Sequence, residues 1–382
     1  LNEVGGNPQR FGVSGDEFHE YMGLRAARQP QSMNATATHD TKRGEDVRAR
    51  IHVLSEIPGE WELCLKKWSQ WNRRNKRRLG GVEAPDKNDE YFLYQTLVGA
   101  APFGGPWGRE FRDRMEAYVI KAVREAKVHT AWIKPDTAYE EAYLDFVRTL
   151  LTPSPRNPFL EDFPPFQRKI AFYGVFNSLA QTLVKITAPG VPDFYQGTEL
   201  WDLSLVDPDN RRPVDFAARS SSLADLESAW RRNPAHLLAD LLTCRADGRI
   251  KQFVIWRGLQ DRRERPDLYR KGGYLPLRVE GGRKDHVLAF ARQYRNEWAV
   301  TVVPRFLTSV VEAGRDPLGD PVWQDTRILL PQEAPVRWRN EFTAQSLYGE
   351  NNALPLGRVL ERFPVALLGQ WRRKARTVSN RT

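Results

Sequence analysis

The chain has 382 residues and a mass of 44.0 kDa, with 41% hydrophobic and 28% charged residues, which is typical of a folded globular protein and excludes a disordered one. Its net charge of +10 permits a nucleic-acid partner, but acidic residues are interspersed with the basic ones through most of the chain, and we expect no such partner. The mean hydropathy is −0.59 and no apolar run reaches about 18 residues, so we expect no membrane partner either.

The first element that the pattern predicts is a strand over residues 33–38, which ends at a polar pair, His39 and Asp40. A helix-rich stretch follows, in which apolar residues recur at helical spacing between breaks rich in Gly and Pro. The expected helices cover 44–57, 60–78, 88–99, 107–128, 138–151 and 165–184. A second strand is expected over 184–187, followed by a loop over 188–200.

Beyond a turn-rich segment over 207–216, two further helices are expected near 221–243 and 248–263. After Gly272 and Gly273 the apolar residues alternate instead, which predicts short antiparallel strands over 286–292, 298–304, 325–331 and 364–368. The first part of this order is similar to two βα units of a parallel barrel with a large helical insertion between them. Such barrels carry their chemistry at the carboxyl ends of the strands.

No metal or redox pattern is present among the usual ligand residues. Cys64 and Cys244 lie far apart in sequence, so we expect two reduced thiols in the core of a cytoplasmic protein. The six histidines show no ligand spacing, and no GxSxG, P-loop or dinucleotide glycine motif occurs. We therefore expect neither a metal nor another cofactor.

The densest polar cluster is THDTKRGED, residues 38–46, directly after the first expected strand. Asp40 beside His39 fits a catalytic carboxylate with a hydrogen-bonding neighbour, and Lys42 and Arg43 fit an anionic or hydroxyl-rich ligand. The alternative is a helix start, with Asp40 or Thr41 as the N-cap and the later acids interacting with the helix dipole. The pattern alone does not separate the two readings.

Three segments resemble the maltooligosyl trehalose synthases, a family within the α-amylase-type glycoside hydrolase superfamily. They are LNEVGG over 1–6, THDTKRGEDVRAR over 38–50 and PGVPDFYQGTELWDLSLVDPDNRRPVDF over 189–216. The resemblance implies an α/β fold, the C-terminal portion of a (β/α)8 barrel with a large helical insertion, followed by an antiparallel β-sandwich domain. The divisions it implies are a barrel segment over 1–57, the insertion over 58–164, the eighth strand and final barrel helices over 165–274, and the β domain over 275–382.

The same resemblance implies roles for individual residues. Asp40 matches the third catalytic carboxylate of the superfamily, and His39 the histidine that contacts the same sugar, although Thr38 stands where an Asn is usual. The segment over 189–199 is similar to the loop that follows the eighth strand. Further sugar contacts are expected, by position, from Lys42, Arg43, Tyr195 and Gln196.

The reaction that the resemblance implies converts the reducing-end α-1,4 bond of a maltooligosaccharide into an α,α-1,1 bond by retaining intramolecular transglycosylation. It needs a nucleophilic carboxylate and an acid/base carboxylate about 5–5.5 Å apart. In the superfamily both precede the His-Asp motif by more than the 38 residues before His39 in this chain. We therefore expect an N-terminal remainder of the same enzyme as a partner, and no activity without it.

Two other functions remain open on the sequence alone. One is a related α-glucan hydrolase or 4-α-glucanotransferase, whose product would keep a reducing end. The other is a non-catalytic glucan-binding fragment.

Overall fold

A computed structural model describes residues 7–371 except 8, 11, 106 and 208. The motif expected over 1–6 lies outside the described residues. None of the described helices combines the length and the apolar character that a membrane span requires.

The first half of the chain is predominantly helical. Its elements are α1 (Gly15–Arg28), β1 (Met33–Asn34), α2 (Glu45–Val53), α3 (Pro58–Asn72), β2 (Arg77–Leu79), β3 (Val82–Ala84), α4 (Lys87–Ala100), α5 (Arg109–Ala126), α6 (Thr137–Leu151) and α7 (Phe159–Thr187). Several helices begin where a side-chain oxygen accepts a backbone N–H of the first turn, as Asp86 does for α4 and Asp136 for α6.

The second half changes from helices to strands. Its elements are β4 (Val191–Pro192), α8 (Phe216–Arg232), α9 (Pro234–Thr243), α10 (Arg249–Glu264), α11 (Pro266–Lys271), β5 (Gly273–Pro276), β6 (Val279–Glu280), β7 (Val287–Tyr294), β8 (Glu297–Pro304), α12 (Asp320–Trp323), β9 (Arg327–Leu329), β10 (Arg337–Asn340), β11 (Ser346–Tyr348), β12 (Ala353–Pro355), α13 (Leu356–Val359) and β13 (Ala366–Gln370). All four expected C-terminal strands are present.

β1 and β4 form a two-stranded parallel sheet in which Met33 pairs with Val191. The expected strand over 184–187 was wrong, because these residues form the last turn of α7. The buried residues Leu179, Leu183 and Ile186 continue one helical face, and this period outweighs the β-branched character of the turn. The chain leaves the helix at Ala188, where the following proline favours an extended conformation.

The sequence pattern predicts only helices between these two strands, but the structure also contains a short β-hairpin there. β2 and β3 form an antiparallel hairpin across Gly80 and Gly81, both of which have positive φ. Two adjacent residues of positive φ are the requirement of a two-residue hairpin turn, and glycine meets it without strain. The expected helix over 60–78 therefore ends earlier, at Asn72.

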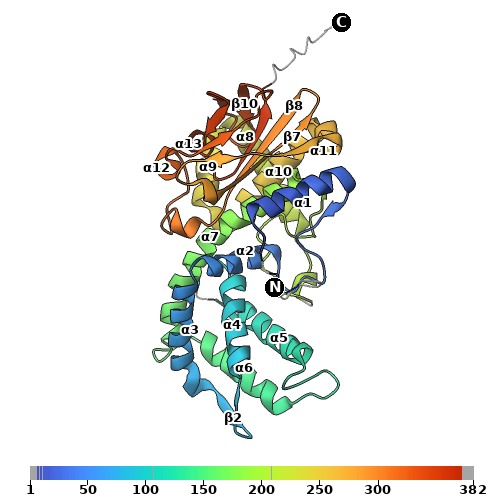
Figure 1. Ribbon diagram of the computed structural model, residues 1–382. Helices are drawn as coiled ribbons and strands as arrows, with labels where there is room; N and C mark the ends of the chain where they lie inside the picture. The colour runs from blue at the N-terminus through green and yellow to red at the C-terminus, as the bar shows by residue number, and fades with distance from the viewer. Residues whose placement is uncertain (1–6, 8, 11, 106, 208, 372–382) are drawn as a thin grey trace.

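The C-terminal region contains two antiparallel sheets, in the orders β11-β10-β13-β8-β7-β5 and β12-β9-β6. Neither sheet is closed. The helices α3 to α6, with the β2–β3 hairpin, are called the helical part of the molecule below. α7 runs from this helical part to the β part and contacts α2, α10 and β8 along its length (Figure 1). Cys64 and Cys244 are both free, as expected, and both are partly buried. Cys64 packs against the main apolar core, whereas Cys244 places its Sγ 3.6 Å from Asp240 Oδ1, so the expected core position was wrong for Cys244.

Candidate functional site

His39 and Asp40 lie at the tip of a turn that follows β1. The backbone N–H of Thr38 donates to Thr41 Oγ1 at 2.6 Å, and the N–H of Thr41 donates back to the Thr38 carbonyl at 3.3 Å. The side chains of His39 and Asp40 are 61% and 62% exposed, with Nε2 3.4 Å from Oδ2. The turn therefore presents an imidazole and a carboxylate together to the outside.

The helix-start alternative for Asp40 does not match the structure. α2 begins at Glu45, its N-cap is Gly44, and no side chain makes a capping hydrogen bond there. The side chain of Thr41 bonds within its own turn instead. Asp40 is thus not a helix cap.

Lys42 and Arg43 both contact the helical part. Arg43 is buried, donates to Thr96 Oγ1 at 3.0 Å and stacks over the Phe92 ring at 4.8 Å. Lys42 Nζ lies 3.5 Å from Glu125 Oε2. The structure therefore does not bring the Arg43 guanidinium together with the Asp40 carboxylate.

The loop after β4 lies beside the His39–Asp40 turn and is joined to it by Asn210. Asn210 Nδ2 donates to the His39 carbonyl at 2.8 Å, and the Tyr195 hydroxyl donates to the Asn210 carbonyl at 3.4 Å. Gln196 is exposed on the same loop. The sequence reasoning missed Asn210, although it lies within the quoted 189–216 motif. A long-range hydrogen bond to a backbone carbonyl leaves no local signal.

Glu45 and Asp46, the last two residues of the THDTKRGED cluster, are buried in an ionic cluster. Lys251 Nζ lies 2.6 Å from Glu45 Oε1 and 2.7 Å from Asp46 Oδ2, and Lys185 Nζ lies 3.2 Å from Glu45 Oε2. Asp46 Oδ2 also accepts the Asp202 N–H at 2.7 Å. The cluster joins α2, α7 and α10 to the loop that follows β4.

Burial and charge act against each other in this cluster. Burial disfavours the ionised form of Glu45, but the ammonium groups of Lys251 and Lys185 outweigh it and hold its pKa at about 2. Burial raises the pKa of Asp46, and the neighbouring Glu45 charge adds to the shift. The two acids are therefore structural groups and not free catalytic carboxylates.

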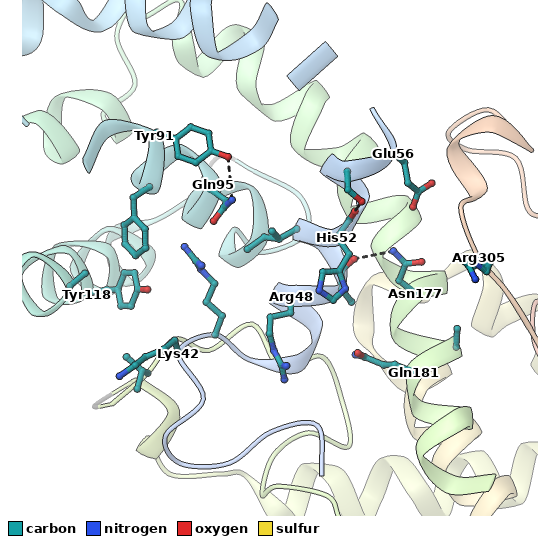
Figure 2. Close-up of a pocket in the computed structure, with 18 of the residues that line it drawn as sticks. Lys42, Arg48, His52, Glu56, Tyr91, Gln95, Tyr118, Asn177, Gln181 and Arg305 are labelled. Atoms are coloured by element: carbon teal, nitrogen blue, oxygen red, sulfur yellow. Dashed lines mark hydrogen bonds between the residues drawn. The ribbon is translucent and has the colours of Figure 1, made fainter. Parts of the chain in front are cut away.

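A cavity of about 1150 Å³ adjoins the candidate site. Figure 2 shows Lys42 and Tyr118 on one side of it and Asn177 and Gln181, both from α7, on another. The face of α2 that carries His52 lines it as well. The cavity is thus bounded by the helical part, by α2 and α7, and by the ends of β7 and β8.

One possible ligand cluster, Asp86, Asp89 and His129, was not apparent from sequence spacing, and its ligand atoms lie within 4.8 Å of one another. Hydrogen bonds within the protein explain why these three side chains lie close together. Asp86 Oδ1 accepts the Asp89 N–H at 2.8 Å as the cap of α4, its Oδ2 lies 2.8 Å from His129 Nε2, and Tyr139 donates to Asp89. These bonds explain the cluster as a helix-start motif of the helical part.

No family model matches the chain. Two curated proteins from Mycobacterium tuberculosis strains, both described as putative maltooligosyl trehalose synthase, are each 36% identical over 368 residues, which is 96% of this chain and 41% of the relative. Among solved structures, maltooligosyltrehalose synthase from Arthrobacter ramosus is 36% identical with a TM-score of 0.78, covering 97% of this chain and 43% of that one. A hypothetical maltooligosyl trehalose synthase from Sulfolobus tokodaii is 32% identical with a TM-score of 0.70, at 97% and 43% coverage.

The chain spans about two fifths of the length of the curated relatives that it matches. The resemblance expected from the motifs is confirmed: over nearly its whole length, this chain is similar in sequence and structure to a part of the maltooligosyl trehalose synthases.

Proposed function

We propose that the chain is the C-terminal part of an isomerase that converts the reducing-end α-1,4 bond of maltooligosaccharides into an α,α-1,1 bond by retaining intramolecular transglycosylation. The observation that carries the proposal is the exposed His39–Asp40 pair on a turn after β1, joined by Asn210 to the loop after β4. Similarity to named synthases along 96% of the chain supports the same reaction.

In this reaction the Asp40 carboxylate accepts hydrogen bonds from hydroxyl groups of the sugar whose bond is broken, and His39 donates to the same ring. These bonds accelerate the reaction to the extent that they tighten as the ring distorts toward its oxocarbenium-like transition state. Tyr195, Gln196 and Lys42 contribute sugar contacts at the edge of the site. Arg43 acts indirectly, since its buried contacts with Thr96 and Phe92 fix the backbone beside Lys42.

The parallel pair β1 and β4 corresponds, in this proposal, to the seventh and eighth strands of a (β/α)8 barrel. The segment over 58–164 is then the insertion between them, 165–274 completes the barrel, and the two sheets after residue 275 form a β-sandwich. Shared burial supports the last point, because Ile328 and Leu354 of the smaller sheet belong to one apolar cluster with Val300 of the larger.

The nucleophile and the acid/base belong to an N-terminal remainder of the enzyme, and the remainder packs against β1 and β4. Each of these strands has one partner among the described residues, so each leaves an edge for further pairing. The adjoining cavity of about 1150 Å³ offers a further surface for that remainder.

Replacement of Asp40 by Asn in the complete enzyme tests the proposal. We expect turnover to fall by several orders of magnitude with a smaller change in KM, because the lost interaction acts mainly in the transition state. Asp113→Asn is the matched control, since Asp113 is an exposed residue of α5 that pairs with the likewise exposed Arg109. Near-normal turnover of the Asp40 variant would refute the assigned role.

Product analysis of the unaltered enzyme tests the two alternative functions. A product with a reducing end would favour a hydrolase or 4-α-glucanotransferase. Binding of the sugar without any product would favour a glucan-binding fragment.

A further inference from the structure

We propose that Arg114 of α5 is a positioning residue for the His39–Asp40 turn and acts through Asp209 and Asn210. The importance of the turn for catalysis rests on the proposed function. The structural link rests only on the contacts described next.

The first step of the link is a bidentate ion pair between α5 and the segment after β4. Arg114 Nε and Nη2 donate to the two carboxylate oxygens of Asp209, each at 2.8 Å. The two side chains are only 13% and 9% exposed, so solvent screens the pair weakly. Arg114 also donates to the Leu203 carbonyl at 2.9 Å, and Asp209 accepts the Leu205 N–H at 2.8 Å. The guanidinium therefore fixes both ends of this short segment.

The second step runs from Asp209 to the turn. Asp209 and Asn210 are consecutive residues of one 3₁₀ turn, Asp209–Arg211. Once Arg114 holds the carboxylate of Asp209, the backbone of Asn210 is held as well. Asn210 in turn donates to the His39 carbonyl at 2.8 Å and accepts from the Tyr195 hydroxyl at 3.4 Å. Arg212 Nε also lies 3.1 Å from Asp209 Oδ1, but its side chain is far more exposed than that of Arg114. Arg114 is thus the buried partner that holds the turn contacting both sides of the candidate site.

A weaker second contact joins the same helix to the same turn region. Glu125 of α5 lies 3.5 Å from Lys42 Nζ and 2.8 Å from Lys121 Nζ. Lys42 and Glu125 are about one third exposed, and exposed pairs of this kind contribute little. The buried Arg114–Asp209 pair is therefore the main connection, and it gives the helical part a role in the chemistry of the site.

Hydrogen exchange of the 382-residue chain tests the link. The amides of Thr38, Asp40 and Thr41 are hydrogen-bonded within the turn, so their exchange reports its opening. In Arg114→Met we expect these amides to exchange about tenfold faster. Arg124→Met is the matched control, because Arg124 lies on the same helix and makes a similar bidentate pair, but with Glu140 of α6. It should leave the turn unchanged.

Two further variants keep the test independent of misfolding. Asn210→Ala removes only the second step, so it should speed exchange in the turn while leaving the Leu205 amide protected by Asp209. Arg114→Lys keeps the charge and should restore protection in part. Unchanged exchange in both Arg114→Met and Asn210→Ala would overturn the link.

Kinetics of the complete enzyme separate the link from the proposed function. Arg114→Met and Asn210→Ala should lower kcat by about tenfold or more with a smaller rise in KM, and Arg114→Lys should recover part of the loss. Faster exchange with normal kcat would leave the link intact and refute the catalytic importance of the turn. Slower turnover with unchanged exchange would refute the link instead.

Discussion

Lys251 of α10 places its ammonium group 2.6 Å from Glu45 and 2.7 Å from Asp46 of α2, although 205 residues separate Lys251 from Asp46 in the chain. All three side chains are buried. The contact fixes the start of α2 and, with it, the segment that carries His39 and Asp40. Glu45 and Asp46 therefore anchor the backbone that follows the exposed pair to α10.

Removal of the Lys251 charge should destabilise the fold strongly. In Lys251→Met two buried carboxylates lose their common partner, and such a loss costs about 3–5 kcal/mol. Chemical denaturation measures the change. Lys271→Met is the control, since Lys271 forms an exposed pair with Asp267 and its replacement should stay within about 0.5 kcal/mol. Equal effects of the two variants would show that the buried cluster does not stabilise the protein.

The stability that Glu45 provides should disappear in acid. Its pKa is about 2 in the folded protein and 4.5 as its ordinary value. Because the folded-state pKa is the lower one, the contribution is complete above about pH 4.5 and is lost as the pH falls toward 2. The free-energy difference between the unaltered protein and Glu45→Gln should therefore be largest near neutral pH and shrink below pH 4.5. A difference that stays constant from pH 7 to pH 3 would contradict the ionic role of Glu45.

Local patterns were sufficient to predict the exposed pair but not its surroundings. His39 and Asp40 follow a strand signal in a motif that resembles a known family, and the structure places them together on a turn. The strand itself was predicted too long, because β1 ends at Asn34 and not at residue 38. Asn210, Arg114 and Asp209 could not be predicted in the same way, because they meet through tertiary contacts across about 90–170 residues.

The errors in the fold have equally local causes. Residues 184–187 look like a strand because all but Lys185 are β-branched, yet their helical face is buried in α7. The hairpin of β2 and β3 was missed because Arg77 and Arg78 were counted with the preceding helix, although the Gly-Gly pair after Leu79 is a hairpin signal. α1 was not expected, even though Ser14 and Glu17 form a capping box.

A methyl group at Gly174 should disrupt the contact between α2 and α7. A Cβ at this position would lie 2.5 Å from Arg50 Cγ and 3.1 Å from Arg50 Cα, and Arg50 is itself held by the carbonyls of Gly99 and Ala101. Overpacking of this kind costs about 1–3 kcal/mol, so Gly174→Ala should lower the stability to denaturant by that amount. Gly23→Ala of α1 meets nothing within 4 Å and should not lower it.

The final prediction concerns the 382-residue chain by itself. A retaining mechanism needs a nucleophile and an acid/base carboxylate, and the resemblance assigns neither to this chain, so we expect no isomerisation and no hydrolysis of maltooligosaccharides. Asp40 cannot replace them in this proposal, because its role is toward sugar hydroxyls and not toward the bond that breaks.

Supplying the remainder of the enzyme in trans should restore activity, because refolding the two pieces together pairs the edges of β1 and β4 with new strands. Product analysis for a non-reducing sugar measures the recovery. The matched control is the same mixture with Asp40→Asn, which should assemble but turn over far more slowly. Trehalose-linked product from the purified chain alone would show that its catalytic groups lie elsewhere in these 382 residues. An assembled but inactive pair would show that the two pieces must be covalently continuous.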